Sequence, residues 1–290
     1  MCMTEEFNDN ANESMKSIAV LLTVFNRREG TLRCLANLRR MALPDGCRMD
    51  VYLTNDGCTD GTPEAVRAQF PEVKVIDGDG TLYWNRGMYT AWEAAAKAYD
   101  YDYYLWLNDD TFLCPNCIEE LLADVATVND EAIVVATIRS RHQERTTYGG
   151  HALNGKGLVM PNGQMQECCT MNGNCVLIPR RVYQKCGNLD WTFRHAIGDL
   201  DYGYRARKAG FKVLSSKEWL GYCENNPKLP AWARPEVPFL KRVKNLYSPL
   251  GYAEPIPFFH YEKRNFGLAT AIKHFMTINI RVCFPYLWKK

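Results

Sequence analysis

The chain has 290 residues, of which 47% are hydrophobic and 23% are charged, and this balance is ordinary for a globular protein. The formal net charge of +2 hides an asymmetry, because the segment from Lys241 to Lys290 holds nine Lys or Arg residues against two acidic ones. No run of about 18 uncharged apolar residues is present, so we expect no membrane-spanning helix.

The N-terminal segment from Met1 to Asn12 is polar and acidic. We expect residues 1–16 to be disordered, and the basic and apolar regions of a signal peptide are missing there. Twelve cysteines without a secretion signal are most simply buried thiols of a reducing compartment. A zinc site is the less favoured alternative, because nothing fixes the spacing between its two pairs of cysteines: Cys114 with Cys117, and Cys168 with Cys169.

Near-continuous apolar runs alternate with helical patterns from about residue 17 to residue 137. The expected strands are Ser17–Val24, Asp50–Thr54, Val73–Ile76, Tyr103–Leu107 and Ala132–Ala136. The expected helices are Thr31–Met41, Pro63–Phe70, Met88–Tyr99 and Pro115–Val128. Strands of this kind are usually covered on both faces. The alternation therefore predicts a doubly wound α/β sheet, with ligands at the carboxyl ends of its strands.

The pattern changes after about residue 138, where Gly, Asn and other polar residues are frequent. We expect short strands at Cys175–Ile178 and Phe211–Leu214, and a helix at Asp201–Ala209 that ends at Gly210. The sequence thus predicts a first half at 17–137 and a second half at 138–233 that builds onto the same sheet. A basic, amphipathic helical segment follows at 234–290.

Polar residues follow the first two strands. Thr23, Phe25, Asn26 and Arg27 come at the end of the first, and the tight turn Asp56-Gly57 follows the second. Because these residues lie at adjacent strand ends, they predict a crevice suited to a nucleotide. Asp56 could accept a hydrogen bond there from the N3–H of a pyrimidine base. A glycine-rich phosphate loop of the GxxxxGK[ST] or GxGxxG type is missing.

The third strand is followed by a loop that is flanked by glycines and leads into a helix. The residues singled out there are Asp79, Trp84, Asn85 and Arg86. Aromatic rings at a loop tip are stacking candidates, and Arg86 could meet phosphate at the helix N-terminus. The alternative is that the rings simply plug the edge of the sheet.

The fourth strand ends in Asn108-Asp109-Asp110. Adjacent carboxylates repel each other and cost desolvation unless a cation or several donors meet them. Hard oxygen ligands suit Mg²⁺ or Mn²⁺, which bind one or two protein carboxylates together with substrate phosphates. An acidic turn after a buried strand is the alternative.

A second acidic cluster holds Asp199 and Asp201 at the start of a helix, where the helix dipole favours carboxylates. One of them, Asp201 in particular, could cap the helix. Asp199 would then be free to accept a proton from a sugar hydroxyl as a general base.

Four of these motifs, in this order, resemble family 2 glycosyltransferases of the GT-A fold over the first ~215 residues, nearest the bacterial rhamnosyltransferase-like, polysaccharide-biosynthesis branch. The four are Thr23–Arg27, the turn Asn55-Asp56-Gly57, Asn108-Asp109-Asp110, and Gly198-Asp199-X-Asp201 with Arg205. The resemblance implies a mixed sheet whose Rossmann-like nucleotide-binding half is continuous with an acceptor-binding half. It also implies inverting sugar transfer assisted by Mg²⁺ or Mn²⁺. Asp110 would bind the metal, Asn108 or Asp109 would lie near the ribose and diphosphate, Asp56 would bind the base, and Asp199 would be the catalytic base.

The chain departs from the family pattern at two positions: Asn108 stands where Asp is frequent, and Gly198 where Glu usually precedes the catalytic Asp. Two alternatives stay open. A nucleotidyltransferase also combines an α/β sheet with acidic metal ligands, although it usually needs a glycine-rich basic loop after its first strand. A non-catalytic nucleotide-sugar-binding protein would retain the crevice without turnover.

The tail Asn265–Lys290 mixes apolar positions at helical spacing with basic residues. This pattern indicates either core packing or an interfacial helix on anionic lipid. The second reading suits a saccharide acceptor carried on a polyprenyl diphosphate, at the inner face of the cytoplasmic membrane. We do not expect nucleic acid as a partner, because no known binding motif accompanies the basic residues.

Overall fold

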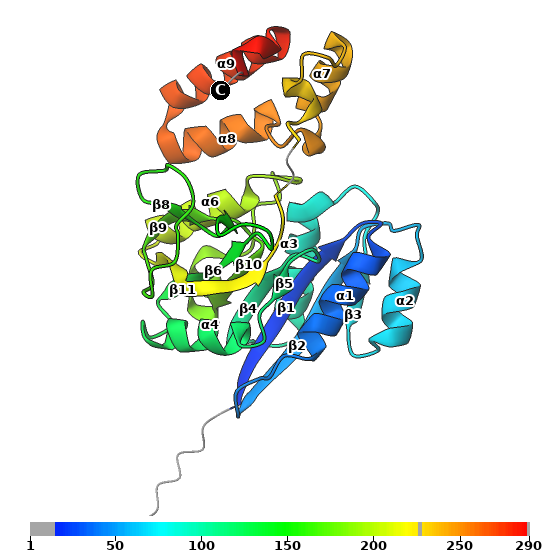
Figure 1. Ribbon diagram of the computed structural model, residues 1–290, viewed down its shortest axis with the longest axis vertical. Helices are drawn as coiled ribbons and strands as arrows, with labels where there is room; N and C mark the ends of the chain where they lie inside the picture. The colour runs from blue at the N-terminus through cyan, green and yellow to red at the C-terminus, as the bar shows by residue number, and fades with distance from the viewer. Residues whose placement is uncertain (1–14, 226–227, 289–290) are drawn as a thin grey trace, which may run out of the picture.

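The computed structural model describes residues 15–225 and 228–288, and one mixed sheet of nine strands runs through the larger part of it (Figure 1). The strand order is β3-β2-β1-β4-β10-β6-β11-β5, with β7 paired to β6, and β8 and β9 form a separate small sheet. The strands are β1 (Lys16–Val24), β2 (Cys47–Asn55), β3 (Lys74–Asp77), β4 (Tyr103–Leu107), β5 (Phe112–Leu113), β6 (Ala132–Arg139), β7 (Thr146–Tyr148), β8 (Gly150–Ala152), β9 (Cys168–Met171), β10 (Cys175–Pro179) and β11 (Lys212–Tyr222).

Strand direction brings the predicted motifs to one edge of the sheet. β1 to β4 are mutually parallel, β10 runs antiparallel between β4 and β6, and β11 is parallel to β6. The carboxyl ends of β1, β2, β3, β4, β6 and β11 therefore meet at the same edge, together with the beginning of β10. The loop after each of these strands faces the same crevice region.

Helices cover both faces of the sheet. The helices are α1 (Arg28–Arg39), α2 (Thr62–Gln69), α3 (Tyr83–Ala98), α4 (Cys117–Ala126), α5 (Arg180–Cys186), α6 (Gly198–Lys208), α7 (Phe239–Leu246), α8 (Pro255–Phe266) and α9 (Leu268–Cys283). Alternate residues of β1 point to opposite faces, so Ile18, Val20 and Leu22 pack with α1, α2 and α4. Ala19 and Leu21 pack with α3, α5 and α6. The doubly wound α/β fold predicted from the sequence is confirmed.

Several boundaries differ from the expected ones. α3 begins at Tyr83 rather than Met88, and α6 begins at Gly198 rather than Asp201. β11 extends to Tyr222, well beyond the expected Leu214. Gly210 does follow α6 with φ +96°, as a glycine in the C′ position should. The expected disordered segment falls mostly on residues 1–14, which lie outside the described residues, and Lys16 already belongs to β1.

The C-terminal segment forms a small helical unit, with α7, α8 and α9 beside α6 and the β8–β9 sheet (Figure 1). Short 3₁₀ turns accompany the helices at Ala231–Ala233, Pro249–Gly251 and Pro285–Trp288. α9 packs against α8 and α7, and the Lys208 side chain of α6 donates to the carbonyl oxygen of Arg264 at 2.6 Å. No helix in the described part of the chain is both long enough and apolar enough to cross a membrane.

Candidate active site

Asp56, the residue after β2, holds the loop that precedes α3. Its buried carboxylate accepts three backbone hydrogen bonds: Oδ1 from Gly80 at 2.9 Å and Leu82 at 3.1 Å, and Oδ2 from Tyr83 at 2.8 Å. Gly57 has φ +70°, and a Cβ there would lie 2.8 Å from the Cα of Gly80, so glycine is required. A carboxylate has about four lone-pair positions. Asp56 therefore retains one for the predicted base contact.

The loop after β1 is fastened to the loop after β2. Asn26 adopts φ +48°, and its Oδ1 accepts from the Thr59 N–H at 2.7 Å. Beside it, the aromatic side chain of Phe25 is 54% exposed. Thr23 lies against α3, because a Cβ on Gly87 would lie 2.0 Å from Thr23 Oγ1. The structure thus brings Phe25 and Asn26 to the predicted crevice, whereas the Thr23 side chain faces α3.

Asp109 and Asp110, after β4, share one cationic partner. Arg27 Nη1 lies 3.4 Å from Asp109 Oδ1, and Arg27 Nη2 lies 3.2 Å from Asp110 Oδ2. Asp109 is buried and accepts from Thr31 Oγ1 at 3.0 Å, whereas the side chain of Asp110 is 38% exposed. Asp110, the predicted metal ligand, is therefore the accessible member of the pair, and Arg27 supplies part of the positive charge that the pair needs.

The surroundings of Asp110 fit a divalent cation that arrives with its substrate. Asp110 Oδ1 is shielded from solvent and accepts no well-formed hydrogen bond within the described chain, although the Cys223 thiol lies beside this carboxylate. A shielded carboxylate oxygen without a partner is costly. The described residues contain no group of three or more His, Cys, Asp or Glu side chains suited to a metal. Carboxylates completed by substrate phosphates are instead the usual ligands of Mg²⁺.

The buried carboxylate of Asp109 lowers the stability of the fold when it is ionised. Desolvation raises the pKa of this carboxyl to about 6, and Arg27 offsets only part of the effect. Because the folded-state pKa lies above that of the unfolded chain, ionisation destabilises the fold; the cost is absent below about pH 4 and complete above about pH 7. We expect Asp109→Asn to raise the free energy of unfolding near neutral pH by about 1–3 kcal/mol.

Urea unfolding of wild type and Asp109→Asn, at neutral pH and again near pH 4, measures this effect. The difference between the two proteins should be large at neutral pH and should disappear at the lower pH. A variant no more stable than wild type at neutral pH would mean that the contacts with Arg27 and Thr31 outweigh desolvation.

Trp84, in the first turn of α3, connects Asn108, the residue before the carboxylate pair, to the second acidic cluster. Its Nε1–H donates to Asn108 Oδ1 at 2.7 Å, and its ring packs edge-on against Trp106 of β4. On the other side, a Cβ on Gly173 would lie 2.4 Å from Trp84 Cζ2, and the Gly173 N–H donates to Asp199 Oδ2 at 2.9 Å. Trp84 therefore lies on a helix rather than at the expected loop tip. A line of contacts runs from Asn108 to Asp199.

Asp199 is a carboxylate without an ion pair in the described part of the chain. It lies partly buried in the first turn of α6, where Oδ1 accepts from its neighbour Leu200 at 2.9 Å and Oδ2 accepts from Gly173. Burial raises the pKa of Asp199, against the opposing effect of these two N–H groups. A carboxylate with spare lone pairs and a raised pKa is suited to accept a proton near neutral pH.

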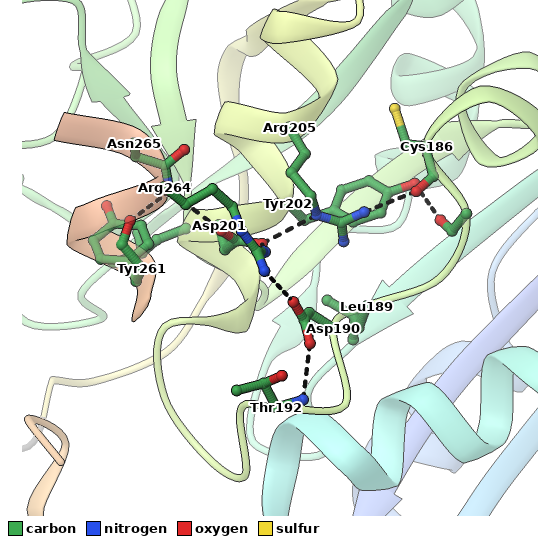
Figure 2. A network of polar contacts seen from close by, with 12 residues as sticks. Cys186, Leu189, Asp190, Thr192, Asp201, Tyr202, Arg205, Tyr261, Arg264 and Asn265 are labelled. Atoms are coloured by element: carbon green, nitrogen blue, oxygen red, sulfur yellow. Dashed lines mark hydrogen bonds and ion pairs between the residues drawn. The ribbon is translucent and has the colours of Figure 1, made fainter. Parts of the chain in front are cut away.

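Asp201 does not cap the helix, in contrast to the expected alternative. The N-cap residue of α6 is Ile197, and no side chain caps this end. Asp201 is fully buried, and its Oδ2 lies 3.0 Å from Arg205 Nε and 2.8 Å from Arg264 Nη1 (Figure 2). Arg264 also pairs with Asp190 at 2.6 Å. Asp201 therefore ties α6 to α8 and fixes the helix that carries Asp199.

Asn85 explains why glycine stands at position 198. A Cβ on Gly198 would lie 1.6 Å from Asn85 Oδ1. Asn85 is fully buried, and its Nδ2 donates to the carbonyl oxygens of Asp190 and Phe193, both at 2.8 Å. Asn85 thus holds the loop before α6. This geometry does not support its predicted contact with a ligand.

Two further predicted ligand residues make local contacts. Arg86 Nε donates to the carbonyl oxygen of Trp191 at 2.9 Å, and its guanidinium lies 4.9 Å from the centroid of the Trp191 ring. Asp79 is exposed and accepts from the Thr81 hydroxyl and N–H, which lowers its pKa. Both side chains stabilise the loops that carry them, and their contacts with a nucleotide stay predictions.

An aromatic group near the carboxylates was missed by the sequence analysis. The ring of His195 lies 5.2 Å from that of Tyr252, which precedes α8, and 6.2 Å from that of Tyr83. Burial lowers the pKa of His195. Tyr148 lies close enough to Asp110 and Tyr252 for both to contribute, after burial, to its pKa of about 12. These residues are far apart in the sequence, so only the folded chain reveals the group.

The sequence matches the model of the family described as glycosyl transferase family 2 over residues 19–187. That range contains all of the predicted site residues except Asp199. A search of curated protein sequences finds no match.

Solved structures of low sequence identity share the fold. S. aureus TarS is 13% identical with a TM-score of 0.55; the match covers 87% of this chain but only 44% of TarS. TarS 1–349 in complex with UDP-GlcNAc is 12% identical with a TM-score of 0.55, over 91% of this chain and 81% of that one. The mannosyltransferase PcManGT from Pyrobaculum calidifontis, in complex with GDP-Man and Mn²⁺, is 12% identical with a TM-score of 0.55, over 90% and 74%. The fold is the expected GT-A fold.

Proposed function

The chain belongs to glycosyltransferase family 2, and from this premise we propose that it is an inverting, metal-dependent enzyme that moves a sugar from a nucleotide diphosphate donor to a saccharide. The line of contacts from Asn108, beside the carboxylate pair after β4, to the lone carboxylate of Asp199 carries the proposal. Its two ends support two parts of the crevice: one that receives the leaving diphosphate and one that receives the attacking hydroxyl.

On the donor side, Arg27 and Asp110 would receive the diphosphate. Negative charge grows on the diphosphate as the glycosidic bond breaks, so positive charge there favours the transition state over the ground state. Mg²⁺ or Mn²⁺, held by Asp110, supplies such charge when bound. Arg27 adds a guanidinium that can pair with phosphate oxygens. Phe25 and Asp56 are the candidates for contact with the base.

On the acceptor side, Asp199 would take the proton. The acceptor oxygen forms a bond to the anomeric carbon from the face opposite the diphosphate. The bond between that carbon and the diphosphate oxygen breaks, and its electron pair leaves with the nucleotide diphosphate. One carboxylate suffices for this displacement, in contrast to glycoside hydrolysis, which uses two.

For the donor we propose dTDP-rhamnose, UDP-galactofuranose, a UDP-hexose or a UDP-N-acetylhexosamine. The UDP-GlcNAc and GDP-Man complexes of the similar structures support a donor of this chemical class. For the acceptor we propose a saccharide linked to a polyprenyl diphosphate in the synthesis of a bacterial capsule or O-antigen. The enzyme would then work at the cytoplasmic face of the membrane.

A panel of these nucleotide sugars, with and without Mn²⁺, tests the proposed activity. We expect release of UDP or dTDP from one donor, stimulated by the metal and by a saccharide acceptor. Release of pyrophosphate from a nucleoside triphosphate and a sugar phosphate would indicate a nucleotidyltransferase instead. Donor binding without turnover under any condition would indicate a non-catalytic binding protein.

Membrane association is supported by an apolar stripe on α9. Leu268, Ile272, Met276 and Ile280, four residues apart, are between 46% and 56% exposed. Another face of α9 is covered, because Ala271 and Val282 are buried and Val282 packs in a small core with Trp232 and Leu246. Core packing and an exposed apolar face thus coexist on one helix. The segment Lys241–Lys290 carries a charge of +7, so the stripe together with this charge suits the surface of an anionic bilayer.

We expect Gln at positions 272, 276 and 280 to weaken binding to vesicles that contain phosphatidylglycerol by roughly tenfold or more, because three apolar side chains no longer insert. Co-sedimentation measures this effect, and circular dichroism verifies that the variant is folded. Ala126→Gln, an exposed change at the end of α4, is the control. Unchanged vesicle binding by the triple variant would remove the stripe from the membrane contact.

A further inference from the structure

Three arginines alternate with three aromatic rings on the surface beside the carboxylate pair. We call this set the arginine–aromatic ladder: Arg33, Phe112, Arg141, Tyr222, Arg139 and Trp219. The guanidinium carbons of Arg33 and Arg141 lie 5.7 and 4.9 Å from the ring centroid of Phe112. Arg141 and Arg139 lie 5.7 and 5.1 Å from that of Tyr222, and Arg139 lies 5.2 Å from that of Trp219.

The ladder begins next to the candidate active site. Phe112 follows Asp110 by two residues, and its backbone pairs with Tyr222 between β5 and β11. Cys223, the residue after Tyr222, has its thiol beside Asp110. The ladder therefore leads away from the carboxylate pair across the carboxyl ends of β6 and β11.

The three arginines of the ladder have no ion-pair partner within the described chain. None of its three arginines forms an ion pair with a carboxylate there, whereas other surface arginines do, such as Arg39 with Glu72. Two carboxylates lie near the ladder without forming an ion pair with it: Glu224 accepts from the Ser140 hydroxyl and the Arg141 N–H, and Glu144 contributes to the raised pKa of Arg139. Arg139 Nη2 donates to the Tyr222 hydroxyl at 3.1 Å, so it is held in place. The ladder thus presents three positioned guanidinium groups without a carboxylate partner.

A cavity of about 470 Å³ opens at the far end of the ladder. Arg139, Trp219 and Tyr222 line one side, and the turn at 161–163 lines another. Lys217 and Glu218 also border it: the Lys217 ammonium lies 2.7 Å from Asp124 Oδ1 and is therefore neutralised, and Glu218 adds one exposed carboxylate to the lining. Arg139 is thus the cation that is left to meet a ligand in this cavity.

We propose that the ladder and this cavity bind an anionic saccharide chain, that is, the part of an extended acceptor that carries carboxylate or phosphate groups beyond the reacting sugar. Guanidinium groups bind both kinds of anion through paired N–H donors. Arginines cover the faces of Phe112 and Tyr222, so these rings are not open platforms for the stacking of bases, which argues against single-stranded nucleic acid. The identity of the chain as an acceptor rests on the proposed function; its binding does not.

Calorimetric titration with tetragalacturonate tests the inference, and its fully methyl-esterified form is the matched neutral ligand. We expect the anionic form alone to bind, and the variant with Gln at 33, 139 and 141 to lose roughly tenfold or more in affinity. The double variant Arg33→Gln, Arg141→Gln changes only exposed side chains. It replaces the triple variant in this titration if the triple variant fails to fold. Gln at 39, 40 and 67 removes the same charge elsewhere and should leave binding unchanged.

Tetrapolyphosphate, titrated in parallel, distinguishes a preference for phosphate from one for carboxylate. Equal binding of both galacturonate forms, or undiminished binding of both anions by the ladder variants, would overturn the inference. Ladder-dependent binding of a single-stranded oligonucleotide, without binding of either anion, would overturn it in favour of nucleic acid. The ladder variants should keep wild-type affinity for the donor nucleotide. The proposed transfer reaction is tested by the nucleotide-sugar panel, so its failure can be distinguished from failure of anion binding by the ladder.

Discussion

Turnover of nucleotide sugar should fall by roughly 10²–10⁴-fold in Asp199→Asn, while affinity for the donor stays close to that of wild type. The amide keeps the shape of the carboxylate but cannot take the proton of the acceptor hydroxyl. Asp199 is separated from the carboxylate pair by Trp84 and Gly173, so the change should not reach the diphosphate. Steady-state nucleotide release and calorimetric titration of the donor measure the two quantities.

The pH dependence provides a second readout for Asp199. Because burial raises the pKa of Asp199, activity should decline on acidification at a higher pH than an ordinary carboxyl would give, and this decline should be absent from the residual activity of Asp199→Asn. Asp201→Asn is the matched control: it should lower thermal stability, since Asp201 pairs with two arginines. Near-normal turnover in Asp199→Asn would assign the base elsewhere.

Most of the sheet could be predicted because its information is local. Buried parallel strands are apolar along their whole length, as in β1 and β4, and the intervening helices have their own period. Parallel strands place their carboxyl ends together, so Asp56 and Asp109 could be assigned to one edge from the alternation alone.

The packing around the site could not be predicted, because it depends on contacts between distant segments. Gly198 stands where the family usually has Glu, and the side chain of Asn85 fills the space beside it. The sequence predicts a loop at the first turn of α3, because glycines flank its aromatic residues; in the structure the helix begins at Tyr83, which has φ +56°. No local pattern distinguishes a buried Asn with two loop partners from an exposed one with a ligand.

The tail presented a different difficulty. Apolar residues at helical spacing predict an amphipathic helix, but the spacing does not tell how many of its faces are covered. In the structure Ala271 and Val282 are buried while Ile272 and Met276 remain exposed. The ladder could not be predicted from the sequence either, because its residues come from α1, β5, β6, β11 and the loop after β6.

Asp110→Ala should abolish the part of donor affinity that depends on Mn²⁺ or Mg²⁺. We expect the metal to strengthen UDP binding by wild type by roughly tenfold or more, and to have almost no effect on the variant, because a charged contact of this kind is worth about 1.5–3 kcal/mol. Equilibrium dialysis of UDP with Mn²⁺ and with chelator gives the ratio directly. Asp77→Asn, an exposed carboxylate at the end of β3 that pairs with Arg67, is the control.

The ratio, rather than either affinity alone, is the informative quantity, because Arg27 complicates the absolute values. Arg27 pairs with Asp110, so removing that carboxylate frees the guanidinium to bind the diphosphate. Affinity without metal can therefore rise in Asp110→Ala even as the response to metal is lost. If Mn²⁺ strengthens UDP binding as much in the variant as in wild type, Asp110 is not the metal ligand, and the positive charge opposite the leaving group must come from Arg27 alone.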